Sequence, residues 1–353
     1  MQKYLKTNRY TVFHSPLRAN QSPFSQLHPS ILDIENDIQY LNSITNRLRI
    51  YDLSGNNQFI PQIAEKYGIK LTVGISLSND DQQNLKNIDA LIRSANNHHN
   101  VIETIVVGND ILAKNIMDES KLIDYIRLVK SKLNSDKIDV TISESWELWI
   151  QHPSLIKEVD HITIHIYPYY QTLNVDVAAL YAVGTHERFQ NALTQYKKEI
   201  IVGETGWPSN GKILGEAVPN SENQRKFIEE FKTLAESNDI KYYFFEAFDE
   251  KWKDIVLTSD AEHNFGLFYE NGTMKKSLNG LIPEPSSFST RNTFNDSPDL
   301  DDSIYLVNYL EDNFSSSLPW LLNLTSWWND ESITNIEFLN AVNYLIKSEI
   351  IKI

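Results

Sequence analysis

Residues 200–210 read Ile-Ile-Val-Gly-Glu-Thr-Gly-Trp-Pro-Ser-Asn, and these eleven residues are the strongest indication of the fold. Three branched apolar residues and a glycine lead into Glu204, and Gly206, Trp207 and Pro208 follow and interrupt an extended strand. This pattern is typical of a buried strand with a carboxylate at its C-terminal end. In an α/β barrel, catalytic residues lie at that end of the strands.

A strand-then-helix rhythm extends on both sides of this stretch, from about residue 10 to residue 283. Eight segments are predicted to be strands: 10–14, 47–52, 70–76, 103–110, 139–145, 161–168, 199–208 and 242–249. Helices are expected at 31–45, 58–67, 80–97, 120–134 and 221–238, the last beginning with a capping-box spacing at Ser221 and Gln224. Eight such units predict an α/β fold of the (β/α)8 TIM barrel type. A doubly wound sheet is the alternative, but no Gly-rich phosphate loop follows the first strand.

Polar residues alternate with apolar ones inside two of the predicted strands. In residues 161–167 every second residue is isoleucine, so the residues between them, Thr163, His165 and Tyr167, are directed to the barrel axis. The same alternation directs Arg49 and Tyr51 inward. Polar groups inside a barrel are costly unless they are paired, so they usually serve a site. The alternative for Arg49 is a buried ion pair without a catalytic role.

A second carboxylate, Asp110, ends the fourth predicted strand and follows Asn109. Cleavage of a glycosidic bond needs two carboxyl groups: one protonates the leaving oxygen, and the other attacks the anomeric carbon or activates water. Asp110 and Glu204 are therefore the catalytic candidates, and Asn109 is placed to donate a hydrogen bond to a sugar hydroxyl. The alternative for Asp110 is to cap a loop or a helix.

More carboxylates follow other strands at the same predicted rim. Glu144 ends the fifth strand, and the eighth strand carries Glu246, Asp249 and Glu250. Clustered carboxylates raise one another's proton affinity, which helps one acid stay protonated near neutral pH. Two lysines, Lys251 and Lys253, offset part of this charge. The alternative is an acidic, solvated rim.

Composition excludes several classes of function. The net charge of −15 argues against nucleic acid as a partner, and no apolar run is long enough for membrane insertion. Without cysteine there is no disulfide or thiolate chemistry, and the scattered histidines predict neither a metal site nor a cofactor. The first residues contain no apolar stretch of the signal-peptide type, which leaves the localisation open between the cytoplasm and the cell surface.

The character of the chain changes after the predicted barrel, residues 1–283. Residues 284–302 are rich in Pro, Ser, Asn and Thr and are predicted to be a linker. Helical periodicity resumes in residues 303–353, which predicts a small helical module. Its Trp327–Trp328 pair is more typical of a small core than of a sugar platform.

Several of these segments together resemble glycoside hydrolase family 17, the β-1,3-glucanase family. The matching stretches are Ser22-Pro23, Arg49-Ile-Tyr51, Val107-Gly-Asn109, residues 159–168, Val202-Gly-Glu-Thr-Gly-Trp-Pro-Ser209, Ser221-Glu-Asn-Gln224 and Phe245-Glu-Ala-Phe-Asp-Glu250. The resemblance covers about residues 10–275. It implies a TIM barrel, a retaining mechanism and β-glucan substrates, with the nucleophile at Glu204.

The resemblance also implies the roles of the other residues. The family's acid/base is a Glu after Val-Gly-Asn, and this chain has Asp110 there, one methylene shorter; a reactive oxygen about 1–1.5 Å further back can cost about 100-fold in rate. The expected substrate-binding residues are Arg49, Tyr51, Asn109, His165, Tyr167, Trp207, Glu246 and Glu250. The alternatives are a β-glucan transglycosylase and a non-catalytic glycan-binding barrel. Residues 303–353 resemble a helical module of archaeal envelope proteins, which predicts association with the cell envelope.

Overall fold

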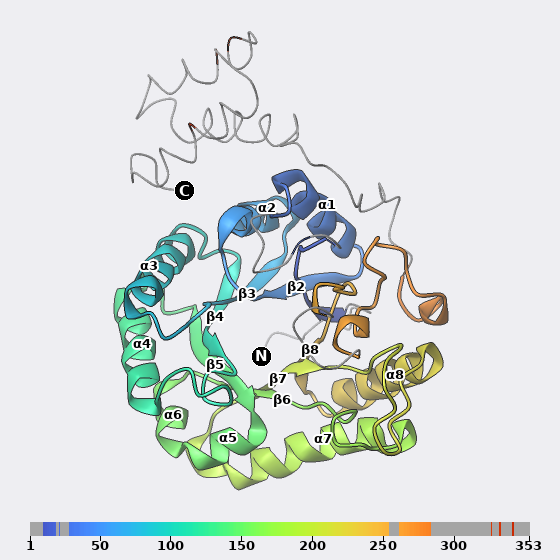
Figure 1. Cartoon of the computed structure of the whole chain (residues 1–353). Helices are drawn as coiled ribbons and strands as arrows, with labels where there is room; N and C mark the ends of the chain where they lie inside the picture. Colours follow the sequence, from blue (N-terminus) through green and yellow to red (C-terminus); the bar gives the residue numbers. More distant parts are fainter. Residues whose placement is uncertain are drawn as a thin grey trace.

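The computed structural model describes residues 10–18, 21, 28–253 and 261–283, with Ser326, Ser332 and Ala341. In these residues eight parallel strands form a closed barrel in the order β1 to β8, and β8 pairs back to β1 (Figure 1). The TIM barrel predicted from the sequence is therefore confirmed. The strands are β1 (Tyr10–Phe13), β2 (Thr45–Ile50), β3 (Lys70–Gly74), β4 (Ile102–Asn109), β5 (Asp139–Ser145), β6 (Ile162–His165), β7 (Ile200–Thr205) and β8 (Lys241–Phe244).

Helices surround the barrel on its outer side (Figure 1). They are α1 (Ile31–Leu41), α2 (Ile60–Tyr67), α3 (Asp81–Asn97), α4 (Glu119–Lys132), α5 (Trp146–Gln151), α6 (Pro153–Glu158), α7 (Val175–Ala192) and α8 (Ser221–Ser237), with short 3-10 turns η1 (Gly55–Phe59), η2 (Thr194–Tyr196), η3 (Glu262–Asn264) and η4 (Lys276–Leu278). The expected cap of α8 is wrong by one residue. Asn220, rather than Ser221, caps the helix, because its side-chain oxygen accepts from the Asn223 N–H.

The apolar core lies between the strands and the helices. The three isoleucines predicted to face outward from β6 and its extension, Ile162, Ile164 and Ile166, are buried there. The barrel interior is polar and tightly packed. A Cβ atom on Gly203 would lie 2.3 Å from Thr163 Cγ2 and 2.6 Å from Arg49 Nη1, so only glycine fits at this point of β7.

Most strands end earlier than the sequence predicts, and the difference is largest for β6, β7 and β8. β6 ends at His165, β7 at Thr205 and β8 at Phe244, whereas strands to residues 168, 208 and 249 were expected. Apolar residues continue beyond the end of β8. Among them, Phe248 is buried and pairs with Phe268 in an isolated bridge outside the barrel strands. Glu246, Asp249 and Glu250 are consequently held by loops rather than by a strand.

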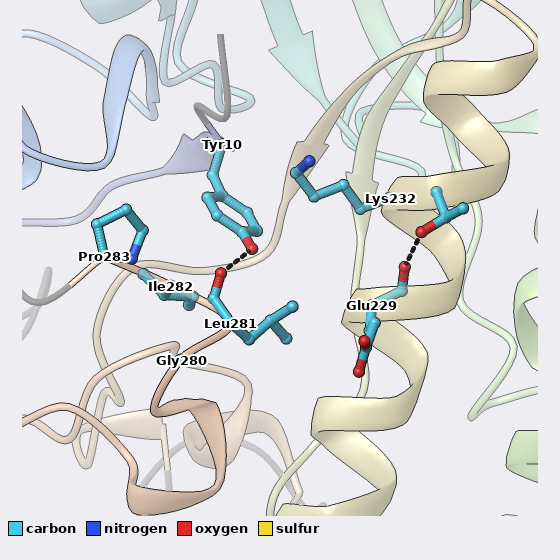
Figure 2. A pocket seen from close by; sticks show the side chains of 8 residues that line it. Tyr10, Glu229, Lys232, Gly280, Leu281, Ile282 and Pro283 are labelled. Atoms are coloured by element: carbon cyan, nitrogen blue, oxygen red, sulfur yellow. Dashed lines mark hydrogen bonds between the residues drawn. The ribbon is translucent and has the colours of Figure 1, made fainter.

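A cavity of about 580 Å³ lies between the first residue of β1 and helix α8 (Figure 2). Tyr10, Glu229, Lys232 and residues 280–283 line it, and the Tyr10 hydroxyl donates to the Leu281 carbonyl at 2.7 Å. Because the strands are parallel, this cavity lies at the N-terminal end of the barrel, opposite to Asp110 and Glu204. It belongs to the end of the barrel that usually serves stability.

The linker and the helical module predicted for residues 284–353 lie outside the described residues, apart from three isolated positions. Ser22 and Pro23 also lie outside them. Among the described helices, none has the length and apolar character needed to cross a bilayer.

Candidate active site

Glu204 lies near the C-terminal end of β7 and is 5 % exposed. Its Oε2 atom accepts a hydrogen bond from the Tyr167 hydroxyl at 2.9 Å. Its Oε1 atom lies 3.4 Å from Arg49 Nη2 and 3.4 Å from His165 Nε2, and no described residue donates a hydrogen bond to it. The side chain is therefore oriented by a hydrogen bond through one oxygen, while the other oxygen is buried beside two nitrogen-bearing side chains.

Asp110 follows β4 directly and has a left-handed backbone, with φ of 54°. Its carboxylate is 3.1 Å from His165 Nδ1, 3.1 Å from the Asn109 side-chain amide and 3.4 Å from Lys114 Nζ. A left-handed backbone at a residue other than glycine stores about 1–3 kcal/mol of strain and persists where the surroundings impose it. The structure thus holds Asp110 at the rim in a conformation that the chain does not prefer.

The imidazole of His165 joins the two predicted catalytic carboxylates. Asp110 contacts Nδ1 of this ring, and Glu204 approaches Nε2, which also pairs with Ser143 Oγ at 2.6 Å. Only the imidazole ring of His165 lies between these contacts of the two carboxylates. The structure therefore brings Asp110 and Glu204 together at one place on the barrel rim.

Electrostatic interactions shift the pKa values of this group. Burial alone would lower the pKa of His165, but the charges of Glu204 and Asp110 raise it above the ordinary value. Burial alone would raise the pKa of Asp110, but His165 and Lys114 hold it below the ordinary range. Both shifts favour the same ion pair, an Asp110 carboxylate beside a protonated His165.

Arg49 organises the opposite side of the site. Its guanidinium donates to the Gly203 carbonyl at 2.6 Å and to the Asn109 side-chain oxygen at 2.6 Å, and lies 5.0 Å from the centre of the Phe13 ring. It therefore connects β2 with the ends of β4 and β7. Its buried ion pair with Glu204 places it within the candidate site rather than in a separate structural pair.

The remaining predicted residues are placed differently. Tyr51 lies at the rim with 36 % of its surface exposed and packs on Phe13, their ring centres 4.3 Å apart. The substrate contact expected of Trp207 stays a prediction, and the structure shows how this side chain packs. This side chain is 1 % exposed, its indole N–H donates to the Val218 carbonyl, and its ring packs against Tyr169 and Phe227. The Trp207 ring thus lies against Phe227 of α8.

Glu246 and Glu250 form a buried cluster with Lys253, whose ammonium lies 2.6 Å from one carboxylate and 2.7 Å from the other. Burial and the charge of Glu250 raise the pKa of Glu246 well above its usual value. Burial would also raise the pKa of Glu250, but Lys253 and a hydrogen bond from Glu246 lower it to about 2. Substrate binding by these two residues stays a prediction.

Sequence reasoning missed Ser143, which contacts His165 in the barrel interior. The sequence contained an indication of this role, because alternation in 139–145 directs Thr141 and Ser143 to the same face.

Among the described residues, no group of three His, Cys, Asp or Glu side chains could hold a metal ion.

Residues 12–266 match the family model described as the BtgE/BtgC glycoside hydrolase domain. A glucan 1,3-beta-glucosidase of Schizosaccharomyces pombe is 30% identical over 258 residues, covering 69% of this chain and 79% of that protein. A probable glucan endo-1,3-beta-glucosidase of Aspergillus fumigatus is 25% identical over 279 residues, covering 71% of this chain. The matched region spans 40% of the length of that Aspergillus relative.

Solved structures share the barrel. A glycoside hydrolase family 17 beta-1,3-glucanosyltransferase from Rhizomucor miehei superposes with a TM-score of 0.65 and 23% identity, covering 76% of this chain and 96% of that one. An endo-laminarinase from Formosa superposes with a TM-score of 0.66 and 20% identity, covering 82% and 92%. At these identities the likeness concerns the fold alone.

Proposed function

This chain belongs to the BtgE/BtgC glycoside hydrolases of family 17, and from this premise we propose that it cleaves β-1,3-glucosidic linkages in β-glucans with retention of anomeric configuration. The observation that carries the proposal is the convergence of two carboxylates on one imidazole at the C-terminal end of the barrel. The names of the related glucosidases support the choice of a β-1,3-glucan as substrate.

In the first step, a carboxylate oxygen of Glu204 forms a bond to the anomeric carbon while the bond from that carbon to the glycosidic oxygen breaks. The leaving oxygen takes a proton from Asp110, and the His165 imidazolium supplies the proton that the pair holds at rest. In the second step, Asp110 accepts a proton from water, the water oxygen attacks the anomeric carbon, and Glu204 leaves. Arg49 and Tyr167 orient the nucleophile throughout.

The direct test is release of reducing sugar from a linear β-1,3-glucan. Glu204→Gln removes the nucleophile and is expected to lower kcat by about 1,000-fold or more. Glu199→Gln is the matched control, because Glu199 precedes the same strand at the opposite end of the barrel and pairs with Lys241. Undiminished turnover in Glu204→Gln would remove this residue from the mechanism.

The same assay separates the alternatives. A transglycosylase passes the glucosyl group of the covalent intermediate to another sugar, so chromatography would detect oligosaccharides longer than the substrate. A glycan-binding barrel would bind the oligosaccharide without releasing reducing sugar. The reason to test for a glycan-binding barrel is Asp110, which is one methylene shorter than the family's Glu. If the chain only binds glycans, Asp110→Glu would create an activity that the natural chain lacks.

We further propose, from the sequence alone, that residues 1–283 are the catalytic barrel, 284–302 a linker and 303–353 a helical module of the kind found on archaeal envelope proteins. Such a module would hold the enzyme at the cell envelope. Comparing the full chain with residues 1–283 in sedimentation with isolated envelopes tests this proposal. Equal sedimentation of both forms would contradict it.

A further inference from the structure

The chain makes a tight turn directly after Asp110. The Asp110 N–H donates to the Ser143 carbonyl at 2.9 Å, and the Lys114 N–H donates back to the Asp110 carbonyl at 3.0 Å. Ile111 folds over Gly108 so closely that a Cβ atom there would lie 2.4 Å from its side chain. The direction of the Asp110 side chain therefore depends on how this turn is held.

The carboxylate of Glu144 holds the turn. One of its oxygens accepts the Leu112 N–H at 2.7 Å, and the other lies 3.4 Å from the Ala113 nitrogen. Alternation along β5 explains the direction, because Ser143 faces His165 inside the barrel and the next residue points away from the axis. Glu144 thus connects the end of β5 to the backbone that carries the acid.

Burying a charged side chain to hold a turn costs free energy. Glu144 is 1 % exposed, and no described lysine, arginine or histidine lies within ion-pair distance of it. Burial raises the pKa of Glu144, and the Leu112 N–H offsets only part of this effect. Buried carboxylates without a cation gather at functional sites, and this one lies next to the acid that is one methylene short.

We propose that Glu144 is a positioning residue for the reaction: its two contacts to the backbone after Asp110 fix the turn so that the shorter acid reaches the glycosidic oxygen. The inference rests on the proposed function. Glu144 touches neither the substrate nor the reacting atoms in this scheme and acts only through Asp110.

The test compares two leaving groups. Glu144→Gln keeps the size of the side chain but weakens its hold on the turn. For a β-1,3-glucan oligosaccharide, whose leaving group needs a proton, kcat/KM is expected to fall about 10- to 100-fold with little change in KM. For a matching disaccharide with a 2,4-dinitrophenyl leaving group, which needs none, kcat/KM is expected to change less than about 3-fold.

Two comparisons separate positioning from a merely structural role. Asp118→Asn is the matched control, because Asp118 caps α4 at the other end of the same connection and accepts the Lys121 N–H at 2.9 Å. It should leave the ratio of the two rates unchanged. In an Asp110→Asn background, Glu144→Gln should add almost nothing to the loss, because the group through which it acts is already gone.

The outcomes are distinct. Equal losses on both substrates, no loss on either, or additive losses in the double variant would overturn the role of Glu144. Thermal unfolding of each variant identifies one that fails to fold, and the milder Glu144→Asp then gives the same comparison. Glu204→Gln is measured alongside, because activity in that variant would contradict the proposed function instead.

Discussion

At the scale of single residues, the two candidate carboxylates are held in different ways. Tyr167 and Arg49 hold Glu204 through side-chain contacts, whereas a strained backbone turn and a charged imidazole hold Asp110. A nucleophile must be oriented toward the anomeric carbon, but an acid must have a proton at hand. The pairing of Asp110 with His165 can supply that proton from the imidazolium, although the same pairing lowers the pKa of the Asp110 carboxyl.

Replacing Asp110 by Asn should separate its two functions. Without a proton donor, kcat/KM for the natural glucan is expected to fall about 100- to 10,000-fold, while kcat/KM for a dinitrophenyl glycoside stays within a few fold. Azide, which needs no base, should restore turnover of that glycoside and give a β-glycosyl azide that NMR can identify. Full activity of the variant on glucan would exclude Asp110 as the acid.

Replacing His165 by Asn should shift the pH profile. In the natural chain Asp110 and Glu204 face the imidazole at short range, Arg49 lies beyond them, and the raised pKa of His165 keeps the shared proton to higher pH. Activity therefore falls only as the pH rises through that raised value. In the variant only the Asp110 carboxyl group holds the proton, and a carboxyl group loses its proton at lower pH than an imidazolium does.

The basic limb of kcat/KM against pH should consequently move down by about one pH unit or more in His165→Asn. His152→Asn, at a half-exposed ion pair with Glu119, is the control and should leave the limb in place. An unchanged limb in the His165 variant would show that the imidazole does not carry the proton.

Strand alternation was enough to predict the inward direction of Arg49, His165 and Tyr167, because the period of β2 and β6 continues up to the rim. It gives no direction for Trp207, because Gly206 and Pro208 interrupt the strand on both sides of this residue. The role of Glu144 in the turn after Asp110 was also beyond the sequence. It depends on contacts between the end of β5 and a turn that lies 31 and 32 residues earlier in the chain.

At the scale of elements, β7 illustrates how packing fixes the site. Gly203→Ala would force a methyl group against Thr163 and Arg49, and the overpacking is expected to cost about 1–3 kcal/mol of unfolding free energy and to displace Arg49 from Glu204. Urea unfolding measures the cost. Gly184→Ala in α7, where the nearest atom is 3.8 Å away, is the control and should stabilise by about 0.5–1 kcal/mol.

The segment after β8 should contribute to acid stability. The pKa of Glu250 is lowered to about 2 by Lys253, below the unfolded value of about 4.3. The group therefore stabilises the fold above about pH 4.3, and its contribution is lost as the pH falls through about 2. Glu250→Gln should flatten the unfolding free energy across this range, while Glu222→Gln on the surface of α8 should not.

The five helices that the sequence predicts lie within a few residues of α1, α2, α3, α4 and α8, whereas α5, α6 and α7 were not predicted. The ends of β6 and β8 were not predicted either, because apolar residues continue past the last barrel hydrogen bond and pack in loops, as Phe248 does against Phe268. The pattern of apolar side chains indicates which residues are buried. It does not indicate whether their backbone is hydrogen-bonded in a strand or lies in a loop.

At the scale of the whole molecule, closure of eight parallel strands is what makes the site. β4 and β7 are not neighbours in the barrel, yet closure directs the ends of both toward one axis, so that Asp110 and Glu204 meet across His165. The cavity beside Tyr10, whose lining residues Figure 2 shows, lies at the other end. In TIM barrels the C-terminal end of the strands carries the active site, and the N-terminal end contributes to stability.

A retaining reaction passes through a covalent bond between the sugar and the nucleophile, and this bond can be trapped. A 2-deoxy-2-fluoro β-1,3-glucobiosyl substrate with a dinitrophenyl leaving group slows the second step, and mass spectrometry of proteolytic peptides then locates the label. We expect one fluorosugar on the peptide that contains Glu204 and none in Glu204→Gln. A label on another carboxylate, or full turnover of natural glucan without any trapped intermediate, would contradict the account.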